Sequence, residues 1–121
     1  MALPTYNFEF VSGETFTLEI TYKNSAGSVV DLSSGFTVDI DGRVEADSTG
    51  TLFSVDSSTS AVALAATSPN ITLTLSPAVT GGIAAPASGV YDVKVTETGP
   101  TPDVVRYILG GKFTVLKAVT S

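Results

Sequence analysis

The sequence predicts an all-β protein, an immunoglobulin-like antiparallel β-sandwich of about seven to nine strands that forms a single domain over residues 1–121. Three observations support this prediction. Apolar and polar residues alternate in many short runs. Clusters of Gly, Pro, Asn, Asp and Ser separate these runs at intervals of about 8 to 15 residues. No segment has the apolar periodicity of an amphipathic helix, which argues against an α/β fold.

The first two predicted strands have the strictest alternation. The first covers residues 6–10 and stops at Ser12-Gly13, and the second covers residues 15–23 and is followed by a turn over residues 24–27. Polar residues, mostly Thr and Glu, occupy the alternate positions. The residues that we expect to face inward are Tyr6, Phe8, Phe10, Phe16, Leu18, Ile20 and Tyr22.

The next part of the chain is less regular. We predict a short strand over residues 28–32 and a longer one over residues 36–40. Asp41-Gly42 indicates a two-residue hairpin turn, because Gly tolerates the positive φ of a type I′ turn. Residues 43–60 predict one or two weak strands around an exposed loop, and residues 61–66 predict a short strand or an irregular segment.

Regular alternation returns at residues 71–76, which predict a strand with an apolar inner face. The segment from Ser76 to Gly81 predicts one helical turn. Ser can cap a helix, Pro77 suits the first helical position, and Gly ends the helix.

The last strands follow a stretch of small residues. One is predicted over residues 90–96, and a rigid Gly-Pro-Thr-Pro loop leads to another over residues 104–109. Gly110-Gly111 then separates it from a final strand over residues 113–115. Gly89-Val90-Tyr91 partly matches the tyrosine corner of immunoglobulin-like domains, although Ala87 stands where the fuller motif has Asp.

The composition narrows the function classes. The chain has no Cys and no His, which removes disulfides, thiolate metal sites and the commonest general base. Twelve acidic and six basic residues give a formal charge of −6, which argues against nucleic-acid binding. No apolar run approaches a membrane span. The first five residues lack the regions of a secretory signal, so we expect synthesis in a cytoplasm.

Acidic residues do not form a recognisable catalytic or metal-binding pattern, so we predict a non-enzymatic protein without cofactor or metal. Neither the spacing nor the terminal Glu of a calcium loop is matched by Asp39, Asp41, Gly42, Glu45 and Asp47. The other acids considered, Glu9, Glu19 and Asp92, alternate with apolar residues and are expected on solvated strand faces. Asn70-Ile71-Thr72 matches a glycosylation sequon, which we attribute to chance.

The expected outer faces of the strands carry mostly Thr and Ser, and only 15% of the residues are charged. Neutral β-branched faces suit strand addition or packing against a neighbouring subunit. We therefore expect part of this surface to be covered in the working state.

Several segments resemble a group of small bacteriophage virion proteins, similar to the N-terminal domains of baseplate upper proteins and to short tail-fibre-associated proteins. These segments are Gly13-Glu14-Thr15-Phe16-Thr17-Leu18, the run from Val30 to Val38, Ile71-Thr72-Leu73-Thr74-Leu75-Ser76, Gly89-Val90-Tyr91-Asp92-Val93 and the run from Arg106 to Val115. The resemblance implies a structural subunit of a virion, made in the host cytoplasm and repeated by symmetry in a tail, a baseplate or a fibre connection. Its partners would be copies of itself and other virion proteins.

For such a subunit we predict contact regions at an exposed edge over residues 104–109 and in the loop over residues 43–60. Obligate interfaces are more apolar than ordinary protein surface, which favours the apolar residues of these two segments. The individual residues predicted at the interface are Val104, Arg106, Ile108, Leu52 and Phe53.

Two alternatives stay open. A capsid decoration protein would share this composition. A carbohydrate-binding module for host-surface glycans would need exposed aromatic rings, and the absence of Trp counts against it. Inward-facing side chains at all four tyrosines, Tyr6, Tyr22, Tyr91 and Tyr107, would remove the second alternative.

Overall fold

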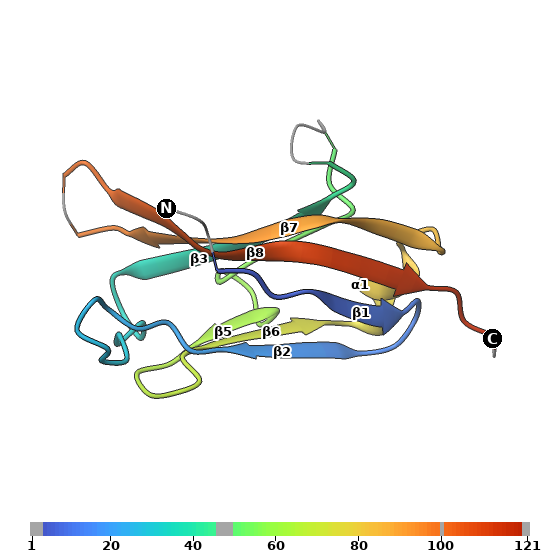
Figure 1. The fold of residues 1–121 in the computed structure, drawn as a ribbon. Coiled ribbons are helices and arrows are strands. Elements are labelled where there is room, and N and C mark those ends of the chain that lie inside the picture. The colour runs from blue at the N-terminus through green and yellow to red at the C-terminus, as the bar shows by residue number, and fades with distance from the viewer. Residues whose placement is uncertain (1–3, 46–49, 100, 120–121) are drawn as a thin grey trace.

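The computed structural model describes residues 4–45, 50–99 and 101–119. In this part of the chain eight strands form two sheets, which confirms the predicted all-β sandwich (Figure 1). The larger sheet has the strand order β1 (Phe8–Val11), β8 (Val104–Leu116), β7 (Ala87–Glu97), β3 (Phe36–Arg43) and β4 (Phe53–Asp56). The smaller sheet has the order β2 (Phe16–Ile20), β6 (Ile71–Leu75) and β5 (Val62–Leu64), and the helix α1 spans Pro77–Gly81.

The strand order is immunoglobulin-like. The strands β2, β6 and β5 correspond to one sheet of that fold, and β3, β7 and β8 correspond to the central strands of the other. Every paired strand is antiparallel except β1, which runs parallel to β8 with Phe8 opposite Phe113. No hairpin connects β1 to β8, so nothing in the chain connectivity requires them to run in opposite directions.

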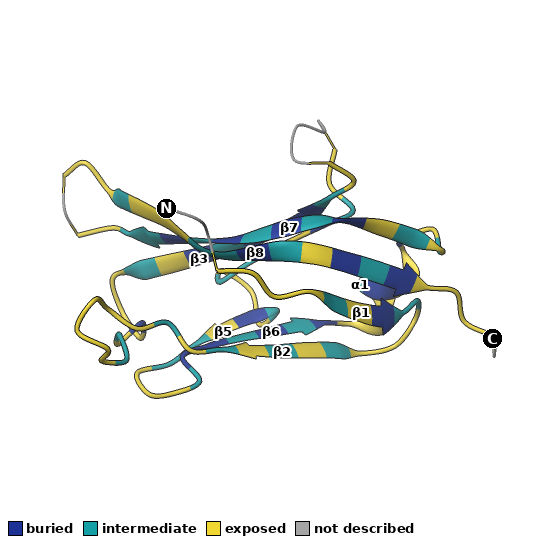
Figure 2. Cartoon of the chain, in the orientation of Figure 1, coloured by how far each residue is buried: buried dark blue, intermediate teal, exposed yellow. Residues whose placement is uncertain are grey.

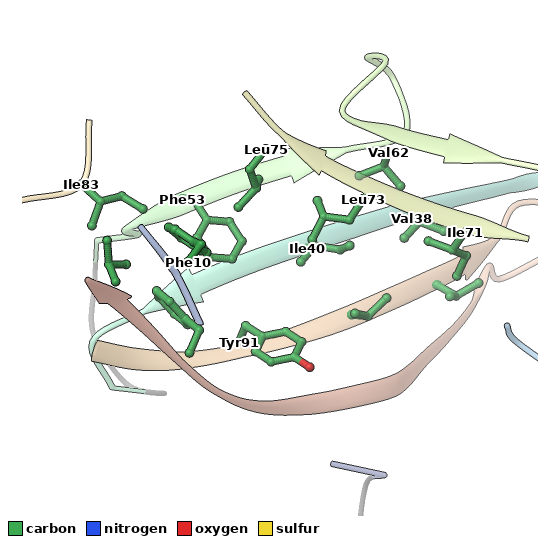
Figure 3. Packing of buried hydrophobic residues seen from close by; sticks show 14 of the residues in the cluster. Phe10, Val38, Ile40, Phe53, Val62, Ile71, Leu73, Leu75, Ile83 and Tyr91 are labelled. Atoms are coloured by element: carbon green, nitrogen blue, oxygen red, sulfur yellow. The ribbon is translucent and has the colours of Figure 1, made fainter. Parts of the chain in front are cut away.

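Apolar side chains from both sheets fill the space between the layers (Figure 3). Along β3, β6 and β7 buried residues alternate with more exposed ones, as the predicted period of two requires (Figure 2). Phenylalanine rings join the two sheets at β1. The ring centroids of Phe8 and Phe16 lie 4.7 Å apart, and those of Phe10 and Phe16 lie 5.3 Å apart. Such pairs stabilise the core beyond their buried area.

The predicted helical turn is confirmed. The helix α1 begins after Ser76, whose side chain accepts a hydrogen bond from the backbone N–H of Val79, and Pro77 occupies the first turn. The buried Thr80 fastens this helix to the turn between β1 and β2. Its hydroxyl donates to the backbone oxygen of Glu14 at 2.7 Å and accepts from the N–H of Gly13 at 3.1 Å.

The predicted hairpin turn at Asp41-Gly42 is wrong, because both residues lie inside β3. They pair there with Asp92 and Tyr91 of β7. A Cβ atom on Gly42 would lie closer to a ring carbon of Phe53 than van der Waals contact allows. Glycine is therefore required at this position by the close approach of an aromatic ring, not by a turn.

Two further segments differ from the predictions. Residues 28–32 form one isolated bridge, between Lys23 and Val29, in place of the predicted strand, and Leu32 is buried in the core. Gly110 and Gly111 do not separate two strands, since β8 is continuous from Val104 to Leu116. A Cβ atom on Gly111 would overlap the backbone oxygen of Tyr6, so the N-terminal segment needs a glycine beside it.

The proposed tyrosine corner is also wrong. Tyr91 is buried, and its hydroxyl donates a hydrogen bond to the backbone oxygen of Tyr6, 85 residues away. In a tyrosine corner the acceptor lies a few residues upstream of the tyrosine. Tyr6 itself precedes β1 and is 50% exposed, contrary to the inward position predicted for it.

Candidate functional site

The strand β8 has an open edge over Val104–Leu109. β7 pairs with this segment except at Ile108, but on the other side β1 covers only Phe113–Leu116 and Thr5 adds one bridge to Gly110. Within the described part of the chain, no strand lies beside Val104–Leu109 on that side. The hairpin end of β7 and β8 extends past the start of β1 (Figure 1).

The side chains of this open edge lie on two faces. Val105 and Tyr107 point to the outer face of the five-stranded sheet and are 50% and 54% exposed. Val104 and Arg106 point to the inner side, where they line a groove of about 440 Å³ together with the loop that follows β2. Ile108 is half-buried and packs against the core.

The structure separates the five residues that the sequence predicted at an interface. Val104, Arg106 and Ile108 lie together on β8, whereas Leu52 and Phe53 lie at β4, the opposite edge of the sheet. Phe53 is only 4% exposed and belongs to the core, and Leu52 is half-buried against it. Phe53 therefore offers no side-chain surface to a partner. Of the predicted contact loop, residues 46–49 lie outside the described residues.

Sequence reasoning missed Val105 and Tyr107, the most exposed apolar side chains of the open edge. The strand pairing shifts by one residue opposite Val93 and Lys94, so β8 contains a bulge. A bulge breaks the alternation on which the prediction depended. The alternating pattern of β7 assigns Lys94 to the outer face, but only the register seen in the structure places Tyr107 beside Lys94.

Three rows of side chains cross the outer face of the five-stranded sheet. Each row is given from β8 toward β4. The first row is Tyr107, Lys94, Asp39 and Asp56, and the middle row is Gly110, Asp92, Asp41 and Ser54. The third row is Lys112, Val90 and Arg43. Gly110 leaves the β8 position of the middle row without a side chain. A hollow of about 840 Å³ lies over these rows, and we call it the outer-face hollow.

Hydrogen bonds and ion pairs orient the β3 side of the outer-face hollow. Asp41 accepts a hydrogen bond from the Ser54 hydroxyl at 2.6 Å, and its carboxylate lies 3.6 Å from the guanidinium of Arg43. The ammonium of Lys94 lies 3.8 Å from the carboxylate of Asp39. The charged side chains of both ion pairs are 31% to 40% exposed, so the pairs fix geometry more than they stabilise the fold.

Asp92 lies in the middle row between Gly110 and Asp41. Burial raises the pKa of the Asp92 carboxyl, and the Asp41 carboxylate raises it further, while Arg43 and Lys94 oppose both effects. The Asp92 side chain makes no hydrogen bond or ion pair with another described residue. Its oxygens are therefore available to a ligand.

The acidic residues singled out in the sequence are spread over separate elements. Asp39, Asp41 and Asp92 face the outer-face hollow, Glu9 and Glu19 are exposed on β1 and β2, and Asp47 lies outside the described residues. Among the described residues, no group of three or more His, Cys, Asp or Glu side chains could hold a metal ion. The arrangement offers hydrogen-bond donors and acceptors to a polar ligand.

The four tyrosines do not all face inward. Tyr91 is 5% exposed and Tyr22 is half-buried, but Tyr6 and Tyr107 are each about half exposed. The condition that would have removed the carbohydrate-binding alternative is therefore not met.

Within the described ranges, no helix has the length and apolar character that crossing a bilayer requires. The sequence matches no protein-family model and no curated protein.

Proposed function

We propose that this protein is a non-enzymatic structural subunit of a bacteriophage virion, a tail, baseplate or fibre-connecting component. It acts by binding copies of itself and other virion proteins. The observation that carries the proposal is the open edge of β8 over Val104–Leu109.

This edge differs from the other sheet edges in the described part of the chain. The edge strands β1, β4 and β5 have three or four residues each and the edge strand β2 has five, and short edge strands discourage pairing with another chain. The unpaired segment of β8 has six residues, which corresponds to about 20 Å of backbone. Five of its six side chains are apolar or aromatic. A strand from another subunit would continue the sheet there through backbone hydrogen bonds.

A second surface also suits close packing between subunits. The outer face of the three-stranded sheet carries Thr17 opposite Thr74, Glu19 opposite Thr72, and Ala63 on the other side of Thr72. Only one of these five residues is charged. Neutral, small and β-branched side chains lose little solvation when a neighbouring subunit covers them.

The virion assignment is supported by the resemblance of five segments to small phage proteins. Two of these segments, around β7 and β8, form the strands that border the open edge. A capsid decoration protein would use the same edge and the same neutral faces, so it is the alternative within this function class.

Val105→Lys tests the role of the open edge, because a charged side chain on an edge strand discourages strand addition. Val119→Lys is the matched control, since Val119 is fully exposed and lies beyond β8. We expect the wild-type protein and the control to form a defined oligomer, or a complex with products of neighbouring genes, in light scattering. Val105→Lys should weaken this association by about tenfold or more.

Circular dichroism of both variants would check that the sandwich is intact. A wild-type protein that stays monomeric alone and with every neighbouring gene product would contradict the proposal. Equal association of Val105→Lys and wild type would show that the open edge is not the contact. A complex with head proteins in place of tail proteins would favour the decoration alternative.

A further inference from the structure

Three polar side chains that line the outer-face hollow have no hydrogen-bond or ion-pair partner within the described part of the protein. Asp92 on β7 and Tyr107 and Lys112 on β8 make no side-chain hydrogen bond or ion pair with another described residue. Tyr107 and Lys112 stand on either side of Gly110, whose missing side chain opens the space above Asp92. An aromatic ring, a carboxylate and an ammonium thus border one gap in the sheet surface.

The charges that line the hollow are balanced. Asp39, Asp41 and Asp92 supply three acids, and Arg43, Lys94 and Lys112 supply three bases. A phosphate chain or another polyanion needs an excess of positive charge, and a cation needs an excess of carboxylates. A neutral ligand with many hydroxyl groups suits such a surface, because each hydroxyl can both donate and accept a hydrogen bond.

The exposed ring of Tyr107 adds an apolar surface to this polar set. A sugar ring has the same dual character, with C–H groups that cover an aromatic face and hydroxyls at its rim. The volume of about 840 Å³ lies within the range of small-ligand sites. The ion pairs with Asp39 and Asp41 hold the β3 side of the hollow in place before a ligand arrives.

We propose that the outer-face hollow binds a neutral saccharide, with the sugar stacked on Tyr107 and its hydroxyls bonded to Asp92 and Lys112. Tyr107 belongs to both the open edge and the outer-face hollow, so a change at Tyr107 affects both surfaces. Asp92 belongs to β7 and lies away from the open edge, so a change at Asp92 tests saccharide binding without altering the edge.

The experiment is a titration of the isotopically labelled protein, followed by amide NMR shifts. The probes are glucose, galactose, mannose, rhamnose and N-acetylglucosamine, each as the monosaccharide and as a short oligosaccharide. We expect at least one probe to shift the amides of β7 and β8 around Asp92, Tyr107 and Lys112. Binding should be insensitive to added salt, because the ligand is uncharged.

Tyr107→Ala should weaken binding about tenfold, through loss of the aromatic surface. Tyr6→Ala is the matched control, since Tyr6 is equally exposed but does not line the hollow. Asp92→Asn keeps the shape of the side chain but removes its charge and one acceptor, and it should weaken binding severalfold. The amide spectrum of each variant reports directly whether it is folded.

Three outcomes would overturn the proposal. The first is that no neutral probe moves the amides around the hollow, and the second is that Tyr6→Ala weakens binding as much as Tyr107→Ala. The third is that calcium chloride or an acidic sugar, titrated in parallel, causes shifts there while the neutral probes do not. The last outcome would assign the hollow to charged ligands.

Discussion

The side-chain amide of Asn70 serves as a strand partner for the backbone of Tyr22. Its oxygen accepts a hydrogen bond from the Tyr22 N–H at 2.7 Å, and its nitrogen donates to the Tyr22 carbonyl at 2.9 Å. The same nitrogen donates to the carbonyl of Val30 at 2.8 Å. Asn70 is completely buried, so the asparagine of the apparent sequon is a structural residue that holds the loop after β2.

Asn70→Ala should therefore lower the free energy of unfolding by about 3 kcal/mol, because three backbone groups lose their buried partner. Urea denaturation followed by circular dichroism would measure this change. Asn24→Ala is the control. Asn24 also accepts hydrogen bonds from two backbone N–H groups, but it is exposed and water can replace it, so we expect a loss below about 1 kcal/mol. Equal losses in the two variants would contradict this account.

Thr80→Val should lower the free energy of unfolding by about 2 kcal/mol. The new side chain has nearly the same shape, but it leaves the carbonyl of Glu14 and the N–H of Gly13 without their hydrogen-bond partner. The same substitution at the exposed Thr17 should change stability by less than about 0.5 kcal/mol. Parallel urea denaturation curves test this, and a neutral effect at Thr80 would show that α1 is not fastened through its hydroxyl.

Stability should fall as the pH rises from 10 to 12. Burial, followed by the nearby Tyr6, raises the pKa of Tyr91 from 10.0 to about 12. The unfolded chain then releases the Tyr91 proton at a lower pH than the folded chain. The contribution of Tyr91 is complete below pH 10 and is lost as the pH approaches 12.

Tyr91→Phe should reduce this alkaline loss, although it costs about 1 kcal/mol at neutral pH by removing the hydrogen bond to Tyr6. Unfolding free energies measured in urea at several pH values would show both effects. An unaltered pH profile in Tyr91→Phe would refute the assignment.

Gly42→Ala should destabilise the protein by about 2 kcal/mol, because the added methyl group meets the ring of Phe53. In a protein that already carries Phe53→Leu, Gly42→Ala should cost less stability than it does in the wild type, because the smaller side chain leaves room for the methyl group. Gly99→Ala is the control, as a methyl group there would have no heavy atom within 4 Å and the φ of Gly99 is not positive. Thermal unfolding of the wild type, the two single variants at Gly42 and Phe53 and the double variant measures the coupling between these two positions.

The fold class, the positions of most strands and the helical turn at Ser76-Pro77 could be predicted from the sequence. These features depend on local patterns: a period of two along a strand, or a capping residue next to a proline. The spacing of Phe16, Leu18 and Ile20 determined which face of that strand is apolar, whatever lies opposite it.

Only the tertiary structure decided how distant segments meet. Gly42 is a glycine because Phe53 covers it, Gly111 because Tyr6 passes beside it, and Asn70 is polar because Tyr22 needs a hydrogen-bond partner inside the core. The outer-face hollow depends in the same way on a strand register that places Gly110 beside Asp92. Register and bulges are set by contacts between strands that lie far apart in the sequence, so no local pattern in a single chain specifies them.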